Sequence, residues 1–242
     1  MESYLGNKCA DWIKDWFSKN GNEETKALIC ISGGKDSSIA AALCCKALGK
    51  DRVIGLLLPD GNQPDISDSI KLVKFLDIKS YTINISSIMD ETCYSVRKAT
   101  EKLDLPEQFM TNTPARIRMM MAYSLAQTIG NCRVINTCNL SENYIGWETY
   151  GGDDFGDMSP LGGITSDKVI KIGDELELPK ELVHKVPSDG MCGKSDEDKF
   201  GFTYDELNAT INKGIIGKNF AKIEQMHKWS EFKRNNINLP TF

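Results

Sequence analysis

Short apolar runs alternate with longer amphipathic segments through the first half of the chain. Short and mostly apolar runs are typical of strands buried in a parallel sheet. They predict strands at Ala27–Ile31, Arg52–Leu58, Ser80–Ile83 and Arg133–Asn136. Apolar positions at helical spacing predict helices at Tyr4–Lys19, Ser38–Leu48, Ile66–Leu76, Ile88–Lys102 and Pro114–Ile129. This alternation predicts an α/β fold, a doubly wound parallel sheet with helices on both faces.

The pattern changes in the second half of the chain. Gly151–Gly163 is rich in glycine, aspartate and proline, which predicts a functional loop. Helices are expected at Thr165–Leu176, with Thr165 as N-cap, and at Phe202–Asn212 and Lys218–Arg234. Pro187–Gly201 is highly charged and predicts an irregular, mobile segment. No internal repeat or linker is evident, so residues 1–242 predict a single domain.

The segment Ser32-Gly33-Gly34-Lys35-Asp36-Ser37 separates the first predicted strand from the helix that follows it. Glycines let the backbone approach an anion, and a helix N-terminus offers free N–H groups and a positive dipole end. Lys35 adds a cation, and Ser32, Ser37 and Ser38 add hydroxyl groups. Asp36 would repel a phosphate unless it holds Mg²⁺, which prefers oxygen ligands and bridges phosphates. The segment therefore predicts a site for a nucleotide polyphosphate and Mg²⁺.

Two common nucleotide loops do not fit this segment. A Walker loop needs Ser or Thr after the lysine and a further glycine upstream, but Asp36 follows Lys35 and Ile29 stands upstream. The glycine pattern of dinucleotide-binding folds is also absent. The segment instead resembles the SGGxDS loop of the N-type ATP pyrophosphatases, which cleave ATP between the α and β phosphates. An ordinary glycine turn before a helix is the alternative.

Composition narrows the class of protein. The chain has 242 residues with a net charge of −5, which disfavours a general nucleic-acid binder. No apolar run is long enough to span a membrane, and the first residues do not resemble a secretion signal. The eight cysteines form no C-x-x-C pair and there are two histidines, so a zinc or iron–sulfur site is not expected. We expect reduced thiols and a cytoplasmic protein.

Segments of the second half narrow the resemblance to one branch of that superfamily. They are Asn112–Met119, Asn136–Glu142, Gly152–Asp157, Ser159–Leu161, Lys185–Gly190 and Ser195–Asp205. With the glycine loop, they resemble the ammonia-dependent NAD synthetases in order along nearly the whole chain. The resemblance implies an adenine nucleotide alpha hydrolase-like fold. It also implies a ligase that joins ammonia to deamido-NAD (nicotinic acid adenine dinucleotide), using ATP and Mg²⁺, through an adenylated nicotinate.

The resemblance also implies roles for particular residues. The ATP-binding residues would be Ser32, Gly33, Gly34, Lys35, Asp36, Ser37, Thr137 and Ser188. The metal ligands would be Asp36 and Glu142, and the deamido-NAD contacts Arg116, Tyr150, Asp157 and Lys233. Asp153, in the same loop as Asp157, has weaker support as a deamido-NAD contact. Arg118 is equally well explained as such a contact or as a solvated surface arginine. Solvated side chains are also the alternative for Arg116, Glu142 and Lys233. The carboxyl ends of parallel strands share one edge, so the glycine loop and Thr137–Glu142 are expected side by side.

Three positions depart from the family pattern. Tyr150 stands where the family often has lysine. Ser166 stands where another lysine is expected, and Lys168 is a possible replacement for it. Phe232 stands in place of a histidine that precedes the terminal lysine, while His227-Lys228 lies upstream. These changes affect the details of phosphate contact rather than the reaction.

Other functions were weighed against this one. The synthetase half of GMP synthetase and a tRNA thiolase belong to the same superfamily, but a thiolase needs a cysteine pair and a basic RNA face. A nucleotide-binding regulator without turnover would not need both Asp36 and Glu142. No glutaminase domain fits in the chain, so ammonia must be free or come from a partner protein.

Two further expectations concern assembly and movement. The family is homodimeric, and the predicted helix Pro114–Ile129 is apolar on more than one face, which suits either an interface or a core. The segment Pro187–Gly201 is expected to close over the site when nucleotides bind, with a permanently ordered loop as the alternative.

Overall fold

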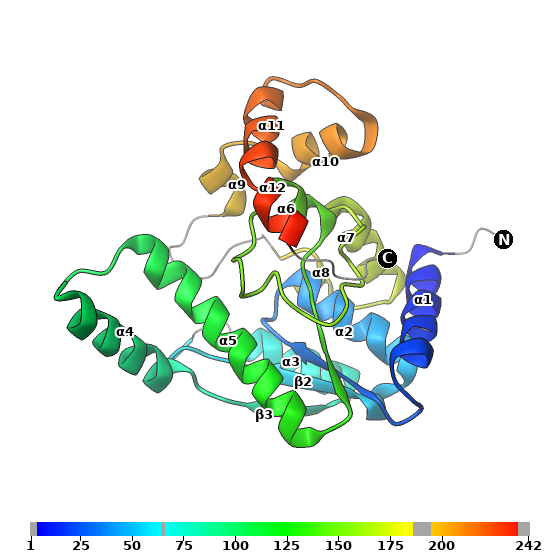
Figure 1. Ribbon diagram of the computed structural model, residues 1–242. Helices are drawn as coiled ribbons and strands as arrows, with labels where there is room; N and C mark the ends of the chain where they lie inside the picture. Colours follow the sequence, from blue (N-terminus) through cyan, green and yellow to red (C-terminus); the bar gives the residue numbers. More distant parts are fainter. Residues whose placement is uncertain (1–3, 64–65, 186–194, 237–242) are drawn as a thin grey trace.

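The computed structural model describes residues 4–63, 66–185 and 195–236 (Figure 1). Its centre is a parallel sheet of β1 (Lys26–Cys30), β2 (Val53–Leu57), β3 (Lys79–Thr82) and β4 (Cys132–Ile135). The strand order is β3-β2-β1-β4. β2 and β3 are therefore added on one side of β1 and β4 on the other, so the strand order reverses between β1 and β4. Ile29 of β1 is in register with Ile135 on one side and Gly55 on the other. The doubly wound parallel sheet predicted from the sequence is confirmed.

Alternating strand residues feed two hydrophobic cores, one on each face of the sheet. Ala27 and Ile29 pack with α1 (Leu5–Asn20), α2 (Lys35–Leu48), α3 (Ile66–Leu76), α7 (Ser166–Glu175) and α8 (Lys180–Val183). Leu28 and Val134 face the opposite way, toward α4 (Ser86–Thr100) and α5 (Glu107–Ile129). Side chains alternate between faces along a strand, so a buried parallel strand needs apolar residues at nearly every position.

A third, smaller core lies above the carboxyl end of the sheet, at the top of Figure 1. It joins α6 (Leu140–Ile145), α9 (Asp196–Phe200), α10 (Tyr204–Lys213) and α11 (Phe220–Trp229), and α12 (Glu231–Asn236) follows α11. Its buried members are Ile145, Phe200, Phe202, Tyr204, Leu207 and Ile223. These helices therefore cover the edge of the sheet where ligands bind in this class of fold.

Several predicted boundaries were wrong. Helix α2 begins at Lys35, three residues before the predicted start, so Lys35 and Asp36 lie in its first turn. Helix α5 begins at Glu107, seven residues before the predicted start, and carries Pro114 inside it, where the proline lacks the backbone N–H of a helix interior. The predicted helix Lys218–Arg234 is two helices, α11 and α12, that meet at Ser230.

Part of the charged segment Pro187–Gly201 was also predicted wrongly. Residues 196–200 form the short helix α9, which begins with a capping box between Ser195 and Asp198. Phe200 anchors this helix, with 1% of its surface exposed. Residues 186–194, which include Ser188, lie outside the described residues, so the expected closure of this segment stays a prediction. In the described ranges no helix is both long enough and apolar enough to cross a bilayer.

Phe200 offers a test of how firmly α9 is held. We expect Phe200→Ala to lower the free energy of unfolding by about 3–5 kcal/mol, because it empties the centre of the third core. Chemical denaturation followed by circular dichroism measures this change. Ile216→Ala, at a position that is 76% exposed, is the matched control and should change it by less than about 0.5 kcal/mol. Equal effects of the two substitutions would show that α9 is not anchored in a core.

Candidate functional site

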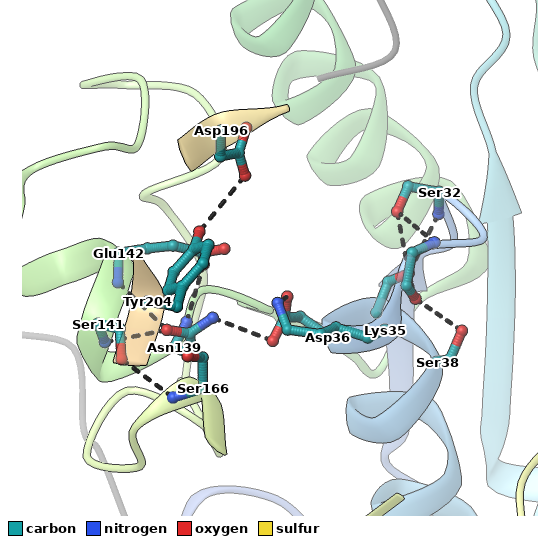
Figure 2. A network of polar contacts seen from close by, with 12 residues as sticks. Ser32, Lys35, Asp36, Ser38, Asn139, Ser141, Glu142, Ser166, Asp196 and Tyr204 are labelled. Carbon is teal, nitrogen blue, oxygen red and sulfur yellow. Dashed lines mark hydrogen bonds and ion pairs between the residues drawn. The ribbon is translucent and has the colours of Figure 1, made fainter. Parts of the chain in front are cut away.

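The glycine loop turns sharply from β1 into α2 and is held by its own hydroxyl groups. The backbone N–H of Gly34 donates to Ser32 Oγ at 3.2 Å, and Ser32 Oγ lies 3.0 Å from Ser37 Oγ. Ser38 Oγ donates to the carbonyl of Gly34 at 2.7 Å (Figure 2). Gly33 has φ +75°, and a Cβ there would lie 2.6 Å from Cβ of Asp68 on α3. Only glycine fits this position, so the tight turn from β1 into α2 requires Gly33.

Lys35 and Asp36 form a buried ion pair at the start of α2. Lys35 Nζ lies 2.7 Å from Asp36 Oδ2, and the Lys35 side chain is 5% exposed. The lysine also lies over the ring of Tyr204, 5.5 Å from its centroid. Tyr204 in turn donates its hydroxyl to Asp196 Oδ2 at 3.3 Å (Figure 2). Helices α9 and α10 therefore hold the lysine in place from above.

Asn139 joins this pair to the segment that follows β4. Its Nδ2 donates to Asp36 Oδ1 at 3.0 Å, and its Oδ1 accepts the backbone N–H groups of Ser141 and Glu142. The Glu142 carboxylate accepts the backbone N–H of Asn139, which completes a capping box at the start of α6. The glycine loop and Thr137–Glu142 thus lie side by side, as the sequence predicted.

The two carboxylates at this junction repel each other. Burial and the nearby Asp36 raise the pKa of Glu142 to about 8. Burial alone would lower the pKa of Lys35, but Asp36 and Glu142 outweigh it and raise that pKa. A cation near Asp36 and Glu142 would stabilise the charged form of both carboxylates.

The donor set at this junction suits Mg²⁺. In the described part of the chain no three acidic, histidine or cysteine side chains form a metal cluster. Mg²⁺ is usually held by one or two carboxylates together with substrate phosphates, rather than by a full protein cage. Asp36 and Glu142 beside an anion-binding loop therefore fit this ion.

A cavity of about 820 Å³ opens between the glycine loop and the third core. It lies where the strand order reverses, the usual ligand crevice of an open α/β sheet. Besides Ser32, Gly34, Lys35, Asp36, Ser37, Thr137 and Glu142, its walls include Arg118, Glu148, Asp153, Lys185, Asp196 and Lys199. Arg118 faces this cavity and donates to the carbonyl of Leu58, so it is not the solvated surface arginine of the alternative interpretation.

None of the four residues expected to contact deamido-NAD lines this cavity. Arg116 donates to the carbonyl of Tyr150, and Lys233 donates to the carbonyls of Gly146 and Glu148. Asp157 accepts from the hydroxyl of Tyr123 and from the backbone N–H of Val134. The side chains of Arg116, Asp157 and Lys233 are bonded within the protein, and the contact of all four residues with a nucleotide stays a prediction.

The positions that depart from the family pattern differ in their surroundings. Tyr150 and Phe232 are exposed, and their ring centroids lie 6.1 Å apart. Ser166 is buried and bonded to Ser141 and Asn208, so no cation replaces the expected lysine there. Lys168 does not supply one, because it donates to Asn212 and is not part of the cavity wall. His227 stacks on Tyr144, with ring centroids 3.9 Å apart.

Sequence reasoning missed Glu148. This side chain is 6% exposed, lies in the cavity wall, and its Oε2 has no hydrogen-bond partner among the described residues. Burial raises its pKa to about 7, and Asp153 and Asp154 add to this while Lys233 opposes it. No periodicity marks the position, since Glu148 follows a helix end in an irregular stretch. The only feature of the sequence that could have indicated a buried site residue is an acidic residue directly after Trp147.

The glycine loop, its buried lysine and the paired carboxylates define a nucleotide-binding α/β protein built for phosphate chemistry. Comparison with known proteins gives the family. The profile of the NAD synthase family matches residues 5–237, so the chain belongs to the NAD synthase family and is a ligase.

Relatives in sequence and in structure agree with this assignment. The ammonia-dependent NAD synthetase of Pyrococcus horikoshii is 31% identical, and the match covers 98% of this chain and 95% of that one. The solved structure of NMN synthetase from Francisella tularensis is 32% identical, with a TM-score of 0.87 over 98% of this chain and 97% of that one. An ammonia-dependent NAD synthetase from Campylobacter jejuni is 25% identical, with a TM-score of 0.73 over 95% and 94% of the two chains.

The raised pKa of Glu148 predicts a stability effect. The folded-state pKa of about 7 exceeds the ordinary 4.5, so the wild-type free energy of unfolding falls as pH rises between these values. Glu148→Gln removes this titration. The variant should therefore gain stability relative to the wild type from pH 5 upward, reaching up to about 3 kcal/mol at pH 8. Urea denaturation in ammonium-free buffer measures the difference, and a gap that does not change with pH would contradict it.

Proposed function

We propose that this protein amidates the nicotinate carboxylate of deamido-NAD with ammonia, consuming ATP and releasing NAD, AMP and pyrophosphate. The observation that carries the proposal is the junction of Lys35, Asp36 and Glu142 beside the glycine loop, in a chain of the NAD synthase family. A carboxylate is a poor acyl donor until its oxygen becomes a good leaving group. ATP makes it one by adenylating it and releasing pyrophosphate.

The residues of the glycine loop bind and orient ATP in this proposal. Backbone N–H groups at the start of α2, the hydroxyls of Ser32 and Ser37, and Thr137 across the cavity hold the phosphates. Lys35 is fixed by Asp36 and Tyr204, so its charge is already directed at the anion before ATP enters. Asp36 and Glu142 would hold Mg²⁺, which would supply positive charge against the charge that develops on the departing pyrophosphate. Ser188 completes the ATP contacts.

The nucleotide carrying the carboxylate needs contacts beyond this cavity. Arg116, Tyr150, Asp157 and Lys233 supply them in a homodimer whose second copy completes the site. Met120 of α5, which is 51% exposed, supports the presence of such an interface, because large apolar side chains are enriched in interfaces between copies. Closure of the part of the charged segment that precedes α9 would exclude water from the adenylate.

Nicotinic acid mononucleotide is a second candidate for the acceptor. The structure aligned with the TM-score of 0.87 is an NMN synthetase, and the NAD synthetase aligned next to it scores 0.73. The four residues assigned to the dinucleotide also lie outside the cavity of this chain. The chemistry at the carboxylate is the same for both nucleotides, so the choice concerns only the adenosine half.

ATP–pyrophosphate exchange tests the reaction and its substrate together. Exchange should appear without ammonia when deamido-NAD is added, and amide should form when ammonium follows. Comparing kcat/KM for deamido-NAD with that for nicotinic acid mononucleotide decides between the two acceptors. Glutamine should replace ammonium poorly. A lack of exchange with either nucleotide would overturn the proposed function, and a tRNA-dependent or GMP-forming reaction would point to another member of the superfamily.

Asp36→Asn is expected to lower the exchange rate by at least about a hundredfold, because it removes one of two carboxylates that hold a charge-stabilising metal. Thermal unfolding should show that the fold is retained. Asp90→Asn, on the exposed side of α4, is the control and should keep wild-type exchange. If the Asp36→Asn variant kept near wild-type turnover at saturating Mg²⁺, the metal role would be wrong.

A further inference from the structure

Lys35 is this chain's own residue in a loop whose other positions follow a shared pattern. It stands at the one variable position of SGGxDS, directly before Asp36. Neighbouring side chains on a helix point in different directions, so adjacency in the sequence does not by itself bring their charges together. In the first turn of α2 the two side chains nevertheless meet, and Lys35 Nζ donates to Asp36 Oδ2 at 2.7 Å.

The Lys35 ammonium lies among carboxylates. Asp36, Glu142 and Asp196 raise the pKa of this lysine against the effect of burial, so the side chain stays a cation. The ring of Tyr204 lies 5.5 Å from Nζ, and its hydroxyl donates to Asp196 (Figure 2). A buried charge needs such compensation, and the compensation acts in both directions. Lys35 therefore balances part of the charge of Asp36 and Glu142, the two acids that suit Mg²⁺.

Both oxygens of the Asp36 carboxylate have a partner. Oδ1 accepts Asn139 Nδ2 at 3.0 Å, and Asn139 is itself fixed because it caps α6. Oδ2 accepts Lys35 Nζ, which stands at the end of a flexible four-carbon stem. A metal ion at Asp36 would lie close to this ammonium, and two cations at one partly buried carboxylate repel each other. The lysine is the partner that can move, so the ion pair and metal binding at Asp36 oppose each other.

We propose that the Lys35 ammonium competes with Mg²⁺ for Asp36, and that its transfer from Asp36 to the phosphates of ATP frees this carboxylate for the metal ion. This inference rests on the proposed function. The lysine lines the cavity beside the glycine loop, so rotation about its own side-chain bonds can carry it from one anion to the other. Nucleotide and metal ion then favour each other's binding, and by linkage each raises the affinity of the other by the same factor.

This competition gives the lysine a role beyond holding a phosphate. Without a nucleotide, the ammonium offsets the repulsion between Asp36 and Glu142, so the two acids can lie together without a divalent ion. When ATP enters, its phosphates take over the ammonium, and the two carboxylates become available as oxygen ligands next to the phosphates. The metal ion is therefore bound together with the nucleotide rather than ahead of it.

Manganese binding to the full-length protein tests the competition directly. Mn²⁺ takes the same oxygen ligands as Mg²⁺, and electron paramagnetic resonance measures the free ion. Without nucleotide, Lys35→Met should bind Mn²⁺ at least about tenfold more tightly than the wild type, because it keeps the apolar stem and removes the competing charge. Lys35→Arg keeps the charge and should bind Mn²⁺ no more tightly than the wild type. Lys46→Met, at an exposed position in the last turn of the same helix, is the control for removing one lysine charge.

Nucleotide binding should change in the opposite direction. An ATP analogue with a methylene group between its α and β phosphates cannot be cleaved there. Its affinity for Lys35→Met, measured by calorimetry without divalent ions, should fall roughly tenfold, the loss of a charge-assisted hydrogen bond. The analogue should also raise Mn²⁺ affinity less in this variant than in the wild type. Adding Asp36→Asn to Lys35→Met should abolish the gain in Mn²⁺ affinity, which locates the ion at Asp36. A merely structural role of Lys35 would weaken both ligands.

Three results would overturn this inference. The first is an unchanged Mn²⁺ affinity of nucleotide-free Lys35→Met, and the second is a weaker one. The third is a wild type that binds Mn²⁺ as tightly without the analogue as with it, a comparison that holds even if Lys35→Met fails to fold. None of these measurements requires turnover. A lack of ATP–pyrophosphate exchange with either nucleotide would overturn the proposed function, while the manganese measurements would still decide whether Lys35 competes for Asp36.

Discussion

The site depends on one side-chain amide. Asn139 bonds Asp36 on α2 through its nitrogen and caps α6 through its oxygen, so a single residue joins the loops that follow β1 and β4. Two partly buried carboxylates are thereby brought together against their mutual repulsion. The three hydrogen bonds of this amide stabilise the arrangement before any cation enters. Without the amide, the two strand ends would still be neighbours, but their acids would be free to turn apart.

Side chains of both charges line the cavity. Lys35 at the start of α2 shares its walls with Arg118, Lys185 and Lys199. Asp36, Glu142, Glu148 and Asp153 line the same walls, and Lys233 donates to the backbone carbonyl of Glu148. An anionic nucleotide therefore meets cations in a space that is not uniformly positive.

The fold was predictable because the strands are short, three of them are largely apolar, and helical patterns alternate with them. The glycine loop was predictable because the positive φ of Gly33 and its closeness to Asp68 leave no room for another residue. Helix ends were less predictable. The hydrogen bond of Asn139 to Asp36 and the packing of the break at Ser230 against Gly146 both join residues far apart in the sequence. Glu148 was missed because its importance comes from burial, which local pattern does not encode. The roles of Arg116, Asp157 and Lys233 were inferred by resemblance, while the structure shows these side chains bonded within the protein.

The break between α11 and α12 has a consequence for how this chain can vary. Gly146 has φ +66°, and a Cβ added there would lie 2.1 Å from Cβ of Ser230. The end of α6 at Gly146 therefore packs directly against the helix break at Ser230, although the two residues are 84 positions apart in the sequence. Neither position can accept a larger side chain alone. Substitutions at the start of α12 are thus constrained by the turn at Gly146, which leads into the loop that carries Glu148. A larger residue at Gly146 would require the break between α11 and α12 to move.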